Sequence, residues 1–232
     1  MLNIAILCGG KATRLGKITK NIPKSLIDIN GKPFIYHQLE LLKKNGFNDI
    51  VLCLGHMGEQ IQEYVCKHVK GMSFCFSYDG ETPLGTGGAI INALPFLSDR
   101  FFVLYGDSYL PVNYQKIGIH YPGCLTAGLM TIYKNNNPHH QNNVAIANNR
   151  VIKYNKGEST GSYIDYGISI FYKHVLENNF KVEPFDLEKI YQLHIQYNNL
   201  YALEIKQRFY EIGSRKGIEE LENYLKEKNN NG

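Results

Sequence analysis

The sequence lacks the features that mark several large classes of protein. Its 232 residues contain no apolar run of the roughly 18 residues that could span a membrane. The N-terminus has no basic segment followed by an apolar core and a cleavage site, so we expect no secretion and a cytoplasmic location. Lysines and arginines do not alternate with aromatic residues, and the net charge is only +4. We therefore expect neither a membrane nor a nucleic acid as a partner.

Cysteine and histidine are too scattered to predict a metal centre built from them. The five cysteines include no Cys-x-x-Cys spacing, which argues against a zinc site, and we expect reduced thiols. The pair His139-His140 lies in a polar stretch and is expected to be a loop. His56 follows Gly55 at the end of an apolar run, where it suits either a nucleotide contact or a structural role.

Apolar and amphipathic segments alternate through the first half of the chain. The pattern predicts strands at 4–8, 50–54, 72–78 and 101–105, with helices at 34–45, 57–69 and 87–97. This alternation is typical of a doubly wound α/β fold. Ligands bind such sheets beyond the carboxyl ends of the strands, which is where the glycine-containing loops fall.

The second half of the chain is rich in predicted strands. These lie at 125–133, 144–147, 151–154, 164–172 and 201–206, and an amphipathic helix is predicted at 216–227. Asn148-Asn149 is expected to form a hairpin turn. Because no linker separates the halves, we expect one domain over 1–232 with a mixed sheet.

The strongest motif follows the first predicted strand. The run Cys8-Gly9-Gly10-Lys11-Ala12-Thr13-Arg14-Leu15-Gly16 leads on to Pro23-Lys24-Ser25-Leu26. Glycines let backbone N–H groups approach anionic oxygens, and Arg14 and Lys24 add positive charge, so the loop predicts a phosphate site. The spacing fits neither a Walker loop nor a Gly-x-Gly-x-x-Gly dinucleotide motif.

These residues resemble the signature of the sugar-phosphate nucleotidyltransferases, Gly-Gly-x-Gly-Thr-Arg-Leu followed by Pro-Lys-x-Leu. Ala12 stands where the family usually has glycine. The resemblance implies a Rossmann-like nucleotidyltransferase fold, with a nucleotide-binding half at 1–112 and a β-rich half at 113–232 that binds the sugar phosphate and ends in a helix. It also implies that Arg14 and Lys24 are catalytic. The loop residues implied to bind the nucleotide are Cys8, Gly9, Gly10, Lys11, Ala12 and Thr13.

A carboxylate at the end of a buried strand, near a phosphate loop, suits a magnesium ion. Asp107 follows the apolar strand 101–105, and it suits either a metal ligand or the cap of the next turn. By resemblance Asp107 is the metal ligand of the family's Gly-Asp motif. A second ligand comes from a late Asp-Ile-Gly-Thr motif, where this chain has Glu211-Ile212-Gly213-Ser214. Glu211 either binds Mg²⁺, directly or through water, or faces solvent.

Further motifs match the family's base-binding and sugar-binding segments. In Glu81-Thr82-Pro83-Leu84-Gly85-Thr86-Gly87-Gly88, the resemblance implies nucleotide contacts by Glu81, Gly85 and Gly88, with Gly88 against the base; a plain helix start fits too. The implied sugar-phosphate residues are Lys156, Asp165 and Gly167. Lys156 also suits a solvated turn, and Asp165, which stands where the family has Asn, also suits a buried turn acid.

The resemblance implies transfer of a nucleotidyl group from a nucleoside triphosphate to a sugar 1-phosphate, with Mg²⁺ as cofactor. Within the family the short chain and the run at 83–90 most resemble the D-glycero-D-manno-heptose 1-phosphate guanylyltransferases, which use GTP. Other acceptors stay open, namely the phosphates of mannose, glucose, N-acetylmuramate or an amino alcohol, and so do the other nucleotides CTP, UTP and dTTP. So does a non-catalytic regulatory subunit, and the resemblance also allows a homo-oligomer.

Overall fold

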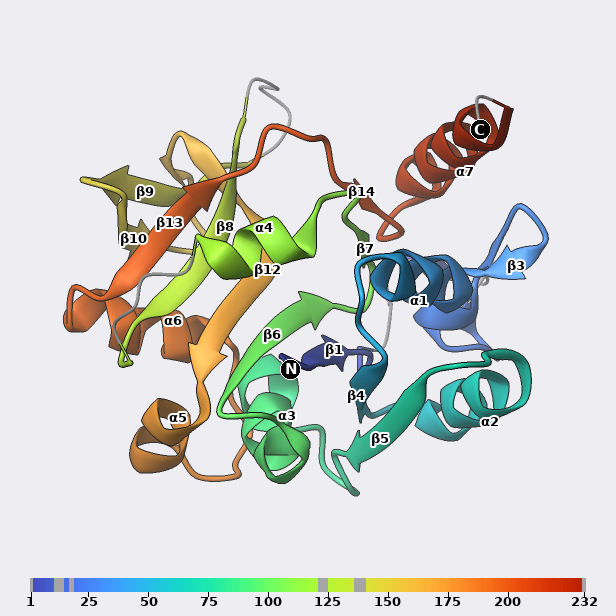
Figure 1. Cartoon of the computed structure of the whole chain (residues 1–232), viewed down its shortest axis with the longest axis horizontal. Helices are drawn as coiled ribbons and strands as arrows, with labels where there is room; N and C mark the ends of the chain where they lie inside the picture. The colour runs from blue at the N-terminus through green and yellow to red at the C-terminus, as the bar shows by residue number, and fades with distance from the viewer. Residues whose placement is uncertain (1, 11–14, 17–18, 121–124, 136–140, 231–232) are drawn as a thin grey trace.

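One ten-stranded sheet runs through the described part of the chain, which is residues 2–10, 15–16, 19–120, 125–135 and 141–230 (Figure 1). In this computed structural model the strands are β1 (Ile4–Leu7), β4 (Asp49–Leu54), β5 (Ser73–Tyr78), β6 (Arg100–Tyr105), β8 (Gly128–Lys134), β9 (Asn143–Ala147), β10 (Arg150–Tyr154), β11 (Thr160–Gly161), β12 (Tyr163–Tyr172) and β13 (Leu200–Glu204). Their order across the sheet is β11-β9-β10-β13-β8-β12-β6-β1-β4-β5.

The first half of the chain supplies four parallel strands. β1 lies between β6 and β4, and β5 forms the edge beyond β4. The second half is joined to them directly, because β12 pairs antiparallel with β6. The predicted mixed sheet is therefore confirmed, and it is continuous across the two halves.

Helices cover both faces of the sheet. Helices α1 (Phe34–Lys44), α2 (Gly58–His68), α4 (Tyr114–Ile119) and α7 (Arg215–Asn230) contribute to one hydrophobic core, whereas α3 (Gly85–Ala93), α5 (Lys173–Asn179) and α6 (Glu188–Gln196) contribute to the other. Along β1 the side chains alternate between these cores, with Ile4 and Ile6 in the first and Ala5 in the second. This is the doubly wound arrangement that the sequence predicts.

The described elements differ from the predicted ones mainly in the helices. Helix α3 begins at Gly85 rather than at 87 and ends at Ala93, because Pro95 lies in a following 3-10 turn and cannot continue the helical hydrogen bonds. Helices α4, α5 and α6 were not predicted, since six to nine residues give too few turns for a clear period. The Asn148-Asn149 turn is confirmed, with φ of 50° and 58° between β9 and β10.

Two short strand pairs lie outside the main sheet. β2 (Asp28–Ile29) pairs with β3 (Lys32–Pro33), just after the 3-10 turn η2 (Lys24–Leu26). β7 (Ser108–Tyr109) pairs antiparallel with β14 (Tyr210–Glu211), which sets Glu211 opposite Ser108. The Ile212 N–H also donates to the Asp107 carbonyl at 3.0 Å. The late motif of the sequence therefore lies beside the end of β6.

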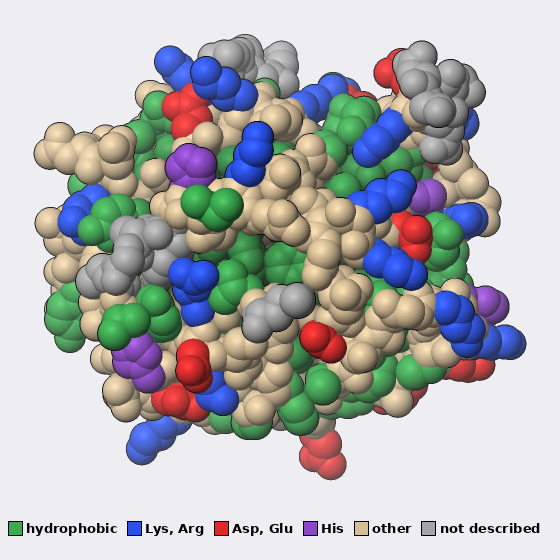
Figure 2. Space-filling view, viewed as in Figure 1, with side chains coloured by type: hydrophobic (Ala, Val, Ile, Leu, Met, Phe, Trp, Pro, Cys, Tyr) green, Lys and Arg blue, Asp and Glu red, His purple; other side chains and the backbone are tan. Residues whose placement is uncertain are grey.

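The surface seen in Figure 2 carries lysine and arginine side chains interspersed with acidic ones. This distribution differs from the continuous basic stripe that is typical of nucleic-acid-binding faces. Among the described residues, no helix combines the length and the apolar character that crossing a bilayer requires.

Candidate functional site

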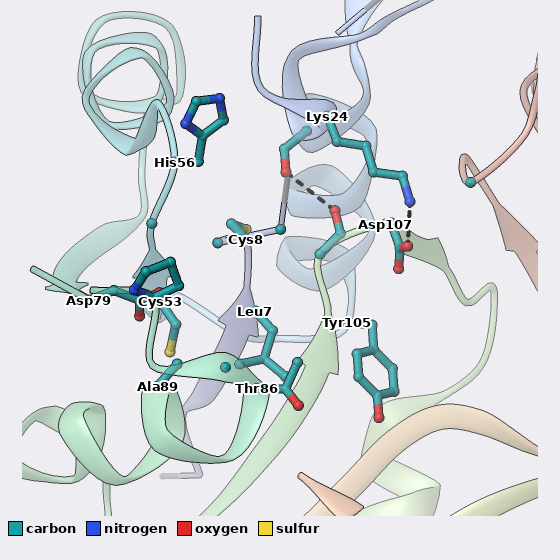
Figure 3. A pocket seen from close by; sticks show the side chains of 18 of the residues that line it. Leu7, Cys8, Lys24, Cys53, His56, Asp79, Thr86, Ala89, Tyr105 and Asp107 are labelled. Carbon is teal, nitrogen blue, oxygen red and sulfur yellow. Dashed lines mark hydrogen bonds and ion pairs between the residues drawn. The ribbon is translucent and has the colours of Figure 1, made fainter. Parts of the chain in front are cut away.

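A cavity of about 700 Å³ opens at the carboxyl ends of β1, β4, β5 and β6. Figure 3 shows His56 and Asp79 on one side of it and Lys24 and Asp107 on the other, with Cys8 between them. The cavity is therefore where a doubly wound sheet places its ligand.

The glycine loop lies against neighbouring strand ends. A Cβ added to Gly9 would come within 3.3 Å of the Gly55 backbone nitrogen, and one added to Gly106 would meet the Leu7 carbonyl at 2.5 Å. Gly9 and Gly10 line the cavity together with Cys8. Burial raises the pKa of the Cys8 thiol to about 12, which favours its neutral form. The remaining predicted loop residues, Lys11, Ala12, Thr13 and Arg14, lie outside the described residues.

Lys24 and Asp107 form an ion pair on the cavity wall. The Lys24 Nζ atom lies 2.6 Å from Asp107 Oδ2, and the two side chains are 15% and 33% exposed. A hydrogen bond between their neighbours keeps the two residues close, since the Ser25 hydroxyl donates to the Gly106 carbonyl at 3.3 Å. The structure thus brings together a cation and a carboxylate that lie more than eighty residues apart in the sequence.

Gly213 completes this corner of the cavity. A Cβ added to Gly213 would lie 3.6 Å from Lys24 Nζ and 3.7 Å from Glu211 Oε1. Gly213 lines the cavity, whereas Glu211 borders a second cavity of about 430 Å³. The carboxylate of Glu211 and the ammonium group of Lys24 therefore both lie close to Gly213.

Two carboxylates near a triphosphate-sized cavity suit Mg²⁺, which commonly takes one or two protein carboxylates together with phosphate oxygens and waters. The chemistry of Asp107 and Glu211 fits this requirement. No group of three or more His, Cys, Asp or Glu side chains is placed to hold a metal among the residues that the structure describes. Mg²⁺ binding by Asp107 and Glu211 stays a prediction.

Asp79 is a cavity residue that the sequence reasoning missed. It directly follows β5, and its Oδ2 atom lies 3.0 Å from the position that a Gly55 Cβ would take. Burial raises the pKa of its carboxyl, although a hydrogen bond from the Leu84 N–H opposes that shift. The available signal was the one that identified Asp107, an acidic residue at the carboxyl end of a predicted strand. His56 also lines the cavity.

The glycines at the start of α3 serve mainly to pack this helix against residues 183–186, which we call the clasp. The Phe185 carbonyl accepts hydrogen bonds from the N–H groups of Gly87 at 2.9 Å and Gly88 at 3.2 Å. A Cβ on Gly88 would collide with the Glu183 carbonyl, and one on Gly87 would collide with the Phe185 ring. The structure thus gives Gly88 a packing role against the clasp, and its contact with the base stays a prediction. Gly85 and Glu81 do line the cavity.

Two of the residues predicted to bind the sugar phosphate, Lys156 and Gly167, lie close to the ring of Tyr105. Tyr105 lines the cavity and was not identified from the sequence. Lys156 Nζ lies 6.0 Å from the centre of the Tyr105 ring. Gly167, with φ of +100°, brings the backbone of β12 against the same ring, where an added Cβ would lie 3.4 Å from Cδ2. Asp165 Oδ1 accepts the Gly167 N–H at 2.9 Å, and burial raises the Asp165 pKa to about 6. Tyr105 thus links the cavity to the residues predicted to bind the sugar phosphate.

Comparison with known proteins gives a consistent result. Residues 4–114 match the family model described as the MobA-like NTP transferase domain. The chain is 41% identical over 112 residues to D-glycero-alpha-D-manno-heptose 1-phosphate guanylyltransferase from Campylobacter jejuni, which is 48% of this chain and 50% of the relative. It is 28% identical over 230 residues to the protein of that name from Aneurinibacillus thermoaerophilus, which is 95% of this chain and 98% of the relative.

A solved structure agrees with these sequence matches. The crystal structure of HddC from Yersinia pseudotuberculosis complexed with GMP-PN is similar to this chain, with a TM-score of 0.82 and 27% identity, covering 97% of this chain and 100% of that one. The chain therefore has the nucleotidyltransferase fold. Its match with the Campylobacter relative spans about half of that relative's length.

Proposed function

We propose that this chain, whose residues 4–114 match the model of the MobA-like NTP transferase domain, transfers a guanylyl group from GTP to a sugar 1-phosphate. D-glycero-D-manno-heptose 1-phosphate is the proposed acceptor, on the basis of the similarity to relatives with that name. The observation that carries the proposal is the Lys24–Asp107 pair at the edge of the glycine-loop cavity. That site offers positive charge, backbone donors and a carboxylate of the kind that Mg²⁺ prefers within one pocket.

The proposed reaction needs no nucleophilic side chain. A phosphate oxygen of the sugar 1-phosphate attacks the α-phosphorus of GTP, the bond between the α-phosphorus and the bridging oxygen breaks, and pyrophosphate leaves. Catalysis of such a transfer rests on positioning and on neutralising charge. Lys24 and Arg14 would balance charge on the triphosphate, and Lys156 would hold the acceptor phosphate.

Asp107 and Glu211 would hold the proposed cofactor Mg²⁺, which supplies further neutralisation of phosphate charge when bound. In the structure the opposite charges of Lys24 and Asp107 lie 2.6 Å apart. The same carboxylate therefore suits both a lysine partner and a metal.

We propose that Asp79 recognises the guanine base by hydrogen bonding. A carboxylate only accepts hydrogen bonds, and guanine presents two adjacent N–H donors on its Watson–Crick edge. Replacing Asp79 by Asn should raise KM for GTP by about tenfold or more, since the charged acceptor is lost, and should weaken the preference for GTP over the other nucleotides. Steady-state kinetics with each nucleotide measures this change. Asp49→Asn, at the exposed start of β4, is the control, and an unchanged GTP preference in Asp79→Asn would refute the assignment.

Pyrophosphate release tests the function as a whole. The purified chain is assayed with Mg²⁺, each of four nucleoside triphosphates, and a panel of heptose, mannose, glucose and N-acetylmuramate 1-phosphates. We expect the highest kcat/KM with GTP and the heptose 1-phosphate. Tight nucleotide binding without release from any combination would favour a regulatory subunit instead.

Two wider expectations accompany this function. The cysteines within the described residues, Cys8, Cys53, Cys66 and Cys75, are free. A cytoplasmic location stays a prediction that fractionation of the producing cell would test. Assembly into a homo-oligomer stays a prediction that a measurement of mass in solution would test.

A further inference from the structure

Asp186, at the end of the clasp, is held by contacts from three parts of the fold. Its Oδ1 atom lies 2.6 Å from Lys156 Nζ, and it accepts the Glu188 N–H at 2.8 Å. The Thr86 side chain also contacts it, and the Thr86 hydroxyl accepts the Leu187 N–H at 2.8 Å. The carboxylate is therefore fixed by backbone and side-chain donors in addition to the lysine.

These contacts keep Asp186 ionised. Burial alone would raise the pKa of its carboxyl, but the hydrogen bonds from Lys156 and from the Glu188 N–H outweigh that effect and hold the pKa below its ordinary value. A charged acceptor held in one place restricts the rotamers that the long Lys156 side chain can adopt.

Lys156 is placed by this carboxylate beside the cavity. Its ammonium group lies over the ring of Tyr105, which lines the nucleotide cavity, and its charge acts on the nearby Asp165. An ammonium group has three N–H donors, and the bond to Asp186 takes one of them. The other two N–H donors can bind an anion.

The clasp connects this lysine to the nucleotide half. The Phe185 N–H donates to the Leu84 carbonyl at 2.9 Å, and the Phe185 carbonyl accepts from Gly87 and Gly88 at the start of α3. Three glycines leave room for this contact, because a Cβ at Gly85, Gly87 or Gly88 would meet clasp atoms. Helix α3 and Asp186 are thus fixed relative to one another.

We propose that Asp186 is a positioning residue, which holds the Lys156 ammonium where it binds the phosphate of the sugar 1-phosphate and ties it through the clasp to the nucleotide helix α3. This inference rests on the proposed function. It differs from an inhibitory role, in which Asp186 would compete with the phosphate for Lys156. The two roles predict opposite changes in acceptor affinity when the carboxylate is removed.

The test replaces Asp186 by Asn, which keeps an oxygen for the Glu188 N–H while removing the charge. We expect KM for the sugar 1-phosphate to rise about tenfold, with KM for GTP within about twofold of wild type, because only the acceptor side loses a charge-assisted bond. Asp186→Glu, which restores the charge one methylene further out, should recover part of the loss. Glu183→Gln is the matched control, since it removes one negative charge from an exposed side chain of the same segment.

Four results would overturn the inference. An unchanged or lowered sugar 1-phosphate KM in Asp186→Asn would exclude positioning while leaving the proposed function intact. A rise in both KM values would indicate that the clasp itself had been disturbed, and a similar rise in Glu183→Gln would indicate a general charge effect. A wild-type chain that releases no pyrophosphate with any sugar 1-phosphate would instead overturn the proposed function, and this inference with it.

Discussion

Replacing Lys24 by alanine is expected to lower kcat by about a thousandfold while leaving the chain folded. The Lys24 side chain is only 15% exposed and lies on the wall of the glycine-loop cavity, so its charge acts on bound phosphate with little screening by solvent. Removing one such group usually costs a factor of a hundred to a thousand, as for other preorganised donors. Pyrophosphate release under saturating GTP and sugar 1-phosphate measures the loss.

Lys20→Ala serves as the control for this result. Lys20 is an exposed lysine four residues earlier, so the variant loses the same formal charge outside the cavity. Circular dichroism should show both variants folded, because Asp107 is 33% exposed and water can hydrate its carboxylate when Lys24 is removed. A Lys24→Ala enzyme within tenfold of wild-type turnover would refute the role of Lys24.

Replacing Asp107 by asparagine is expected to lower kcat/KM by about a thousandfold and to abolish the saturable dependence of the rate on Mg²⁺. Asparagine has nearly the same shape but lacks the charge that a hard cation prefers. The change also leaves Lys24 without its 2.6 Å partner. A titration of activity against Mg²⁺, compared with wild type, separates weaker metal binding, which excess Mg²⁺ overcomes, from complete loss of the site.

Asp99→Asn provides the matched control for that experiment. Asp99 is an exposed carboxylate just before β6, whereas Asp107 lies just after that strand. Asp99→Asn should keep the wild-type Mg²⁺ curve. If Asp107→Asn also kept it, Asp107 would not be a metal ligand.

Local patterns in the sequence were sufficient to predict the nucleotide side of the site. An apolar strand, a glycine-rich loop and a Pro-Lys pair lie within some twenty residues of each other, and the strand before Asp107 is uniformly apolar. Parallel strands bring such ends to one edge of a sheet whatever lies between them. That rule accounts for Asp107 at the same edge as the glycine loop, whereas Lys24 lies in the 3-10 turn η2 and its ion pair with Asp107 was not predicted.

The acceptor side was less accessible from the sequence because it depends on contacts between distant segments. The three glycines at 85–88 were interpreted as space for a base, yet their neighbours are clasp residues about a hundred positions later. A glycine pattern reports that something approaches the backbone closely but does not identify what approaches. Tyr105 was missed for the same reason, since its role depends on Gly167 and Lys156 in the other half.

The pairing of β7 with β14 has a consequence for how the protein is made. The two strands are about a hundred residues apart, so at a synthesis rate of about 5–20 residues per second β7 waits on the order of ten seconds for its partner. During that interval β6 also lacks β12 on one side. The nucleotide half can collapse around β1 and β4 on the ribosome, but the corner that holds Lys24, Asp107 and Gly213 closes only after residues 210–213 have emerged.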